Sequence, residues 1–250
     1  DVAGSSVVRW DLELVEFHLR YGRPSAALDA AKLASGKAPN DLRTLLAYSR
    51  AQLASGDSIS AKSTLNTATR FAEYNAQRQY EISSLQIAAR DLAGAAYSLE
   101  KALSGQPDHL PAKALMASVE LLQGEPAKAE KRAHDIVTQY PKMGVGYGLL
   151  GDVAMAKGQT ASAIESYQRA HQIEAASNSL LKLYGALALQ DAGKSAQQLA
   201  LQWLKVHPED LPVRRALADG YARAGDFTQA RPAYEAALKL SPGNVEILNN

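Results

Sequence analysis

The chain has 250 residues, a formal net charge of +1, 46% apolar residues and no cysteine. This length can bury one large core or a long stacked array, and the small net charge argues against a nucleic-acid binder driven by overall charge. The lack of cysteine excludes a disulfide framework and a thiolate metal site, and no apolar run approaches the roughly 18 residues of a membrane helix.

Three residue types share a period of 34 residues along the chain. Such a period is typical of repeat proteins, in which each repeat is one small unit of secondary structure. Arg90 stands where the period would place a glycine, and the last two glycines are displaced by one residue. The glycines are Gly22, Gly56, Gly124, Gly158, Gly193 and Gly225; the prolines are Pro39, Pro107, Pro141, Pro208 and Pro242; the alanines are Ala27, Ala61, Ala95, Ala129, Ala163, Ala196 and Ala230.

The period divides the chain into seven units between two short ends. A remnant at 1–7 comes first, and residues 245–250 begin an eighth unit that is cut off. Because the chain starts without methionine and stops inside a unit, we expect it to be part of a longer protein. The seven units are 8–41, 42–75, 76–109, 110–143, 144–177, 178–210 and 211–244.

Each unit has the pattern of two helices. In 144–177 the first helix is "VGYGLLGDVAMAK", which Gly158 ends, and the second is "TASAIESYQRAHQI". Ala163, Tyr167 and Ala170 fall at i, i+4 and i+7, so they share one face of the second helix. Prolines at the unit ends stop the second helices, since proline cannot donate an intrahelical hydrogen bond. We therefore predict an all-α chain without strands.

This pattern resembles the tetratricopeptide repeat family, most closely in residues 213–242, "VRRALADGYARAGDFTQARPAYEAALKLSP". The resemblance covers residues 8–244. It implies a right-handed superhelical solenoid of stacked antiparallel helix pairs, in which small residues let the two helices of a unit cross closely. Arg214 departs from the aromatic residue usual at its position. With Leu211 as position 1, positions 4, 7, 8, 11, 20, 24, 27 and 32 hold Arg214, Leu217, Ala218, Tyr221, Ala230, Tyr234, Ala237 and Pro242.

Motifs for catalysis are missing from the sequence. Gly146, Gly148 and Gly151 match G-x-G-x-x-G but fall inside a predicted helix, whereas a dinucleotide site needs a preceding strand. The five histidines lie in different units without metal-ligand spacing, and no G-x-S-x-G nucleophile motif occurs. Side chains at the fifth position of each unit are too mixed to read RNA bases. We expect no enzyme activity, cofactor, metal or nucleic-acid partner.

In proteins similar to this one, positions 2, 5, 9, 12 and 13 of the first helices face a concave groove. Four arginines against Glu16, next to Tyr80, suggest that the first two units bind a protein or peptide with an acidic segment, since arginine pairs with carboxylates. The alternative is that these arginines are ordinary solvated side chains. The candidate groove residues are Arg9, Glu16, Arg20, Arg43, Arg50, Gln77, Tyr80, Asp152, Lys182, Arg215, Asp219 and Arg223.

The resemblance implies a non-catalytic scaffold for protein binding. The alanine-rich units and the ending "ARPAYEAALKLSPGNVEILNN" also look like bacterial repeat lipoproteins of exopolysaccharide and PEP-CTERM sorting systems. That narrower resemblance favours the periplasm or a membrane anchor on its periplasmic side, with the cytoplasm left open. The alternative function is direct polysaccharide binding, with Tyr80 and Tyr147 as contacts. We also expect self-association through an apolar edge at Val245, Ile247 and Leu248.

Overall fold

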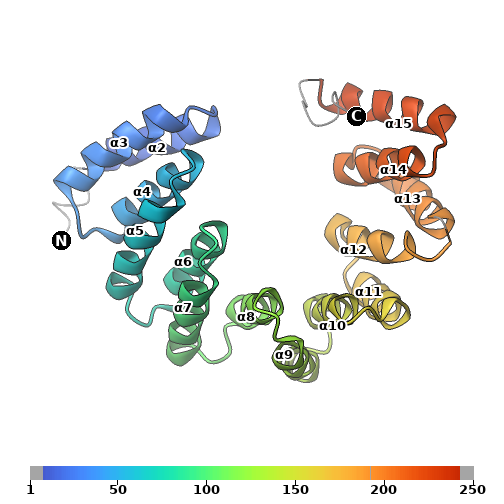
Figure 1. Ribbon diagram of the computed structural model, residues 1–250, viewed down its shortest axis with the longest axis horizontal. Helices are drawn as coiled ribbons and strands as arrows, with labels where there is room; N and C mark the ends of the chain where they lie inside the picture. The colour runs from blue at the N-terminus through green and yellow to red at the C-terminus, as the bar shows by residue number, and fades with distance from the viewer. Residues whose placement is uncertain (1–7, 192, 243–250) are drawn as a thin grey trace. The chain divides into compact units, whose positions relative to one another are not determined.

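The computed structural model describes residues 8–191 and 193–242 (Figure 1). In this part of the chain there are fourteen helices and no strand, so the prediction of an all-α fold is confirmed. The remnant at 1–7 and the predicted apolar edge at 245–250 lie outside the described residues. The helices are α2 (Arg9–Arg20), α3 (Pro24–Lys37), α4 (Leu42–Ala54), α5 (Ser58–Phe71), α6 (Ala76–Ala88), α7 (Leu92–Gly105), α8 (Leu110–Leu122), α9 (Pro126–Gln139), α10 (Gly144–Ala156), α11 (Thr160–Ile173), α12 (Ser177–Leu187), α13 (Lys194–Val206), α14 (Leu211–Arg223) and α15 (Phe227–Leu240).

The chain forms two compact halves, Asp1–Glu125 and Pro126–Asn250. The described helices of the N-terminal half are α2 to α8, and those of the C-terminal half are α9 to α15. The division falls between α8 and α9, the two helices of the expected unit 110–143.

Helix pairs stack in the same manner inside each half. A first helix packs against the second helix that follows it, as α2 does with α3 and α10 with α11, and each second helix packs against the next first helix. First helices also contact one another: α2 with α4 and α4 with α6 in the N-terminal half, α10 with α12 and α12 with α14 in the C-terminal half. The first helices of each half therefore lie in a row, and their outward side chains can meet across helices.

The turns inside the pairs explain the spacing of the glycines. All six glycines of the period have positive φ, between 63° and 82°. Arg90, which occupies the missing glycine slot, adopts the same left-handed conformation with φ of 58°. Its turn is closed as in five of the other six units, because Arg90 N donates to the Ile87 carbonyl and Asp91 N to the Gln86 carbonyl. A left-handed residue with a side chain costs about 1–2 kcal/mol, so the packing of the two helices must hold Arg90 in this shape.

Acidic side chains begin several helices. Asp57 Oδ1 accepts a hydrogen bond from Ser60 N at 3.0 Å, and Asp226 Oδ1 accepts one from Gln229 N at 3.2 Å. Such N-caps satisfy backbone donors that have no partner within the helix. Gln159 precedes α11 without a side-chain cap of this kind. The aspartate after the turn therefore caps three of the second helices, α5, α7 and α15.

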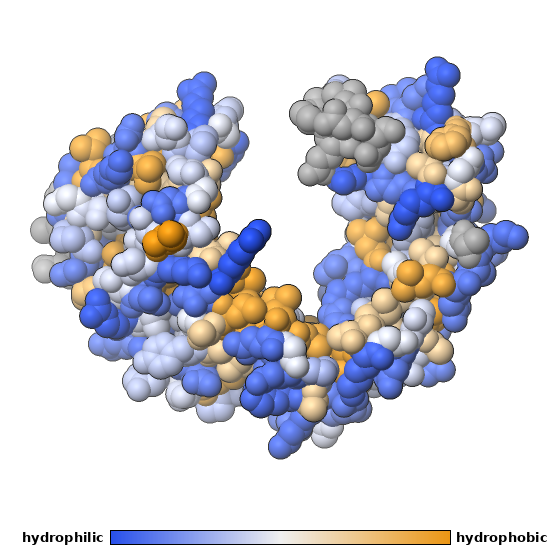
Figure 2. Space-filling model, in the orientation of Figure 1, coloured by the Kyte–Doolittle hydropathy of each residue, from blue (hydrophilic) through white to orange (hydrophobic). Residues whose placement is uncertain are grey.

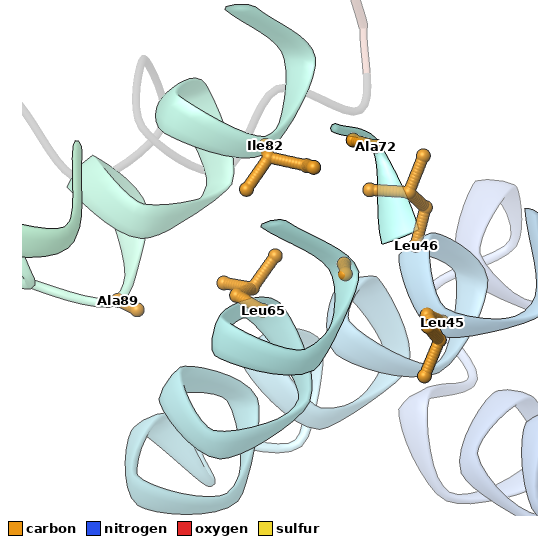
Figure 3. Packing of buried hydrophobic residues seen from close by; sticks show 7 residues of the cluster. Leu45, Leu46, Leu65, Ala72, Ile82 and Ala89 are labelled. Carbon is orange, nitrogen blue, oxygen red and sulfur yellow. The ribbon is translucent and has the colours of Figure 1, made fainter. Parts of the chain in front are cut away.

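The hydrophobic core consists of separate clusters between neighbouring helices. Figure 3 shows one in the N-terminal half, where α4, α5 and α6 direct side chains into a common space. Leu65 and Ile82 are fully buried there, and Leu45 and Leu46 nearly so. Because each cluster joins only adjacent helices, the stability of the fold is a sum of local interfaces, as expected for a repeat array.

The three glycines of the G-x-G-x-x-G motif lie inside α10. A β-carbon built on Gly151 would lie 2.3 Å from Cε1 of Tyr167, and one on Gly146 would lie 2.8 Å from Cγ2 of Val137. At Gly148 no atom outside the adjacent turns of the helix backbone lies within 4 Å of such a β-carbon. Gly151 and Gly146 are therefore required by helix packing, and Gly148 is not.

Alanine substitutions at Gly148 and Gly151 should have opposite effects on stability. Gly148→Ala removes a flexible residue from a helix at no steric cost and should stabilise the fold by roughly 0.5–1 kcal/mol. Gly151→Ala should destabilise it by roughly 1–3 kcal/mol, because the new methyl group would force the buried ring of Tyr167 out of its place. Urea unfolding followed by circular dichroism measures both. Stabilisation by Gly151→Ala would contradict the close packing of α10 on α11.

Candidate functional site

Arg50 links three first helices of the N-terminal half. Its Nη1 lies 3.0 Å from Glu16 Oε1 of α2, and its Nη2 forms a second ion pair with Glu81 of α6. Glu81 also lies 3.4 Å from Nη1 of Arg78. Two of the predicted groove residues, Glu16 and Arg50, are thus brought together. We call this set of three residues, in which Arg50 lies between Glu16 and Glu81, the arginine row.

Two further predicted arginines of the N-terminal half, Arg9 and Arg43, also form ion pairs. Arg9 pairs with Glu13 at 3.0 Å along α2, and Arg43 pairs with Asp41 at 2.6 Å. The hydrogen bond from Arg43 is the main cause that lowers the pKa of Asp41, which is also the N-cap of α4. The sequence-based comparison of four arginines with Glu16 alone left out the three carboxylates of Glu13, Asp41 and Glu81. The spacing of Arg9 and Glu13 by four residues could have revealed the first of these pairs.

Gln77 and Arg20 are exposed, whereas Tyr80 is only half-buried. The Tyr80 ring lies 5.8 Å from the imidazole of His109, whose Nδ1 accepts a hydrogen bond from Ala112 N as the cap of α8. Tyr80 thus belongs partly to the interface of α6 with α8 and presents only part of its ring to a ligand.

The C-terminal half repeats a second polar arrangement. Asp152 of α10 accepts a hydrogen bond from the Tyr167 hydroxyl at 2.8 Å and pairs with Lys182 Nζ of α12 at 2.5 Å. Asp219 of α14 accepts a hydrogen bond from the Tyr234 hydroxyl at 2.7 Å. Both aspartates occupy position 9 of their units and both tyrosines position 24. The structure therefore assigns these predicted groove residues a role in joining helices.

Arg215 and Arg223, also predicted to line the groove, lie beside Asp219. Arg215 Nε is 3.8 Å from the Asp219 carboxylate, and Arg223 Nε donates to the Asp219 backbone carbonyl at 3.2 Å. The carboxylate charge of Asp219 is thus shared between an arginine and a tyrosine hydroxyl.

Sequence reasoning missed one cluster of exposed aromatic residues in the N-terminal half. Lys101 Nζ lies 5.3 Å from the ring centre of Tyr74 and 5.9 Å from that of Tyr97. It also donates a hydrogen bond to the Thr69 carbonyl at 3.0 Å. Both tyrosines are more than half exposed. In the sequence the turn before Tyr74 departs from the common pattern, because Glu73 stands where five of the other six units have proline, and it has φ of 47°.

Other site chemistry is limited in the described residues. No cluster of three or more histidine, aspartate or glutamate side chains there could hold a metal ion. None of the described helices combines the length and apolar character needed to cross a bilayer. Figure 2 shows hydrophilic side chains spread over both halves, with smaller hydrophobic areas among them. The surface thus offers ion pairs and exposed aromatic rings for binding.

Comparison with protein families gives three matches, all to models described as the tetratricopeptide repeat. They cover residues 86–144, 146–177 and 211–250, just over half of the chain. No curated protein matches the sequence.

Solved structures with the same fold have low sequence identity to this chain. A thermophilic TPR protein from Thermus thermophilus has 21% identity and a TM-score of 0.58, covering 70% of this chain and 95% of its own. Yeast Tom70 has 15% identity and a TM-score of 0.73, with 97% of this chain and 52% of Tom70 covered. A tetratricopeptide repeat protein from Parabacteroides merdae has 13% identity and a TM-score of 0.64, covering 97% of this chain and 96% of its own. At these identities the likeness establishes the fold alone.

The tyrosine–aspartate pairs should make the fold sensitive to alkaline pH. Burial, followed by the hydrogen bond to Asp219, raises the pKa of Tyr234 from 10.0 to about 12. Its contribution to stability is complete below the unfolded-state pKa of 10.0 and is lost as the pH rises through the folded-state value. We expect the thermal unfolding midpoint to fall across this window, and to fall less steeply in Tyr234→Phe. The exposed Tyr97→Phe variant is the control, and an equally steep fall in Tyr234→Phe would contradict the assignment.

Proposed function

Because this chain belongs to the tetratricopeptide repeat family, we propose that it is a non-catalytic scaffold that binds an acidic segment of a protein partner on its first helices. We further propose that this binding serves the assembly of a bacterial envelope secretion or exopolysaccharide system. The family supports the general role in protein–protein interaction. The acidic partner segment and the envelope pathway are our proposals.

The observation that carries the partner chemistry is the arginine row. Arg50 and Glu16 keep 35% and 54% of their side-chain surface exposed, so solvent and a ligand can reach both. An exposed ion pair contributes only about 0–1 kcal/mol to stability, and exchanging Glu16 for a carboxylate of the partner therefore costs little. The guanidinium of Arg50 can bind that carboxylate through two parallel hydrogen bonds. Exposed Arg20 and Arg43 lie on the neighbouring first helices α2 and α4 and extend the surface.

The envelope role has its support in the sequence. The alanine-rich units and the ending of the chain resemble bacterial repeat lipoproteins of exopolysaccharide systems. In such a system a non-catalytic array would hold an export or sorting component on the periplasmic side of the membrane. This part of the proposal is independent of the arginine row, and its test is the identity of the captured partner.

Substitution of Arg50 should weaken capture of the partner. The wild-type chain, Arg50→Gln and Arg231→Gln are immobilised and exposed to a bacterial cell-envelope extract, and retained proteins are identified by mass spectrometry. Arg231 is the matched control, because it is exposed on α15 and pairs with Glu235 at 2.9 Å. Loss of a charge-assisted hydrogen bond costs roughly 1.5–3 kcal/mol, so we expect at least about a tenfold loss of affinity in Arg50→Gln alone.

Equal retention by all three proteins would remove the arginine row from the proposal. A retained partner from the cytoplasm, with no role at the envelope, would contradict the pathway while leaving the scaffold role intact.

A second candidate function, polysaccharide binding, is favoured by the cluster of Tyr74, Tyr97 and Lys101. Exposed aromatic faces can stack on sugar rings, and the ammonium of Lys101 can pair with the carboxylate of an acidic sugar. Tyr147, the contact expected from the sequence, is half-buried and lies 5.9 Å from the guanidinium of Arg169. If polysaccharide is bound, the exposed cluster suits it better than Tyr147 does.

Retention on immobilised alginate, a polymer of acidic sugars, tests this candidate. We expect Tyr97→Ala to elute earlier than the wild-type chain because one stacking face is lost. The control is Phe227→Ala, which removes an exposed aromatic side chain from α15, outside the cluster. It should elute with the wild type. Elution of the wild type in the void volume would rule out the polysaccharide function for this class of polymer.

A further inference from the structure

An apolar stripe of four large side chains lies exposed on the first helix. Trp10, Leu14, Phe17 and Tyr21 have 74%, 44%, 46% and 62% of their surface accessible to solvent. The first three lie in α2, and Tyr21 is its C-cap. Spacings of four, three and four residues place them on one face, as in the seam of two paired helices. Contiguous exposed apolar surface of this kind marks an interaction site.

The apolar residues of α2 outside the stripe, Leu12, Val15 and Leu19, pack inside the fold. Val15 is fully buried against Ala27, Ala30 and Ala31 of α3. Within the stripe, the Phe17 and Tyr21 rings touch, with centres 4.7 Å apart. The α2–stripe, defined as Trp10, Leu14, Phe17 and Tyr21, therefore lies outside the core that holds α2 in place.

The residue at position 3 distinguishes the α2–stripe from the face that later first helices pack against the preceding second helix. Trp10 occupies this position, where five of the six later units bury a smaller residue: Thr44, Ala112, Gly146, Leu180 and Val213. At Gly146 even a β-carbon would lie 2.8 Å from Val137 of the preceding second helix. A helix packed on α2 as α9 packs on α10 would meet the indole of Trp10. The face needs an occupant with a different packing geometry.

The spacings between the stripe residues, four, three and four, read the same from either end of α2. In an antiparallel pair of such helices, Trp10 of one copy lies opposite Tyr21 of the other, and Leu14 lies opposite Phe17. In such a pair, side chains on the same flank of the two helices meet, so Arg20 of one copy lies near Glu13 of the other, and these flanking charges are complementary. Contacts that are exchanged between two copies in this way are the property of an interface with twofold symmetry. We propose that the α2–stripe is the contact surface of a homodimer, in which the α2 helices of two copies of this chain pair antiparallel.

The size of the stripe sets the strength of this dimer. Aromatic side chains bury about 150–250 Å² each when fully enclosed, and these are already partly covered. Two copies would together bury on the order of 700 Å², which is less than the roughly 1,200–2,000 Å² of stable interfaces. We therefore expect a dimer in the micromolar range or weaker, which forms as concentration rises.

Sedimentation velocity over a concentration series tests the dimer. The wild-type chain should shift from monomer to dimer, and Phe17→Glu should stay monomeric, because it places a charge opposite Leu14 of the second copy. The control is Ile59→Glu on α5, where an apolar residue of 85% exposure is changed to the same charged residue outside the stripe. Circular dichroism confirms that both variants fold. A strict monomer at all concentrations, or a dimer that persists in Phe17→Glu, would overturn the proposal.

Disulfide cross-linking tests the antiparallel register, since the chain has no cysteine of its own. A mixture of Trp10→Cys and Tyr21→Cys proteins should form a covalent heterodimer under mild oxidation. Each variant alone should not, because identical positions in the antiparallel pair are separated by 11 residues, or about 16 Å along the helix, whereas a disulfide needs Cα atoms within about 7 Å. Efficient cross-linking of Trp10→Cys with itself would contradict the antiparallel arrangement.

The dimer and the proposed partner site can be tested separately. The α2–stripe excludes Arg50, and Phe17→Glu leaves the arginine row unchanged. Normal partner capture by Phe17→Glu, together with loss of dimer, would support two surfaces on the first helices. Loss of capture without any change in oligomeric state would contradict the dimer and place the stripe in the partner site.

Discussion

The close crossing of paired helices is the constraint on which the other features of this protein depend. At Gly151 the helix α10 has no side chain, and the ring of Tyr167 from α11 occupies the space that a β-carbon would need. The tyrosine is buried in this position, and its hydroxyl reaches Asp152. Asp152 in turn pairs with Lys182 on the next first helix. Close packing inside one pair thus positions the polar contact that joins it to the next.

The turn between paired helices contains a left-handed residue whether or not that residue favours this conformation. Arg90 takes up a left-handed conformation that glycine occupies in the other units. A left-handed arginine is unfavourable by itself, and the contacts of α6 with α7 must supply the free energy that holds it. Tertiary packing therefore decides the shape of the turn at Arg90. In the other units, the conformational freedom of glycine lowers the free-energy cost of the same left-handed conformation.

Two surfaces with different chemistry lie side by side on α2. Its charged side contributes Glu16 to the arginine row, where exposed ion pairs can exchange with those of a partner. Its apolar side holds the stripe from Trp10 to Tyr21, where burial of aromatic surface would drive association. In the proposed dimer each copy would keep its own arginine row, so that two partner molecules could be held by one assembly. The exposed pair of Tyr74 and Tyr97 belongs to neither surface.

The amino-acid sequence alone was enough to predict the helical fold and its period, because glycine, proline and alanine act through local backbone and packing requirements that recur along the array. It also identified the residues of the first helices that carry charge. It did not determine how those charges are paired. Arg50 meets Glu16 and Glu81, which lie 34 and 31 residues away, only because stacking brings three first helices together. Tertiary structure likewise decided that Tyr80 packs against His109, and that Trp10 and Phe17 face solvent while their counterparts in later units are mostly enclosed. Pairing and exposure depend on which helix lies next to which, and a single helix pattern carries no information about its neighbour.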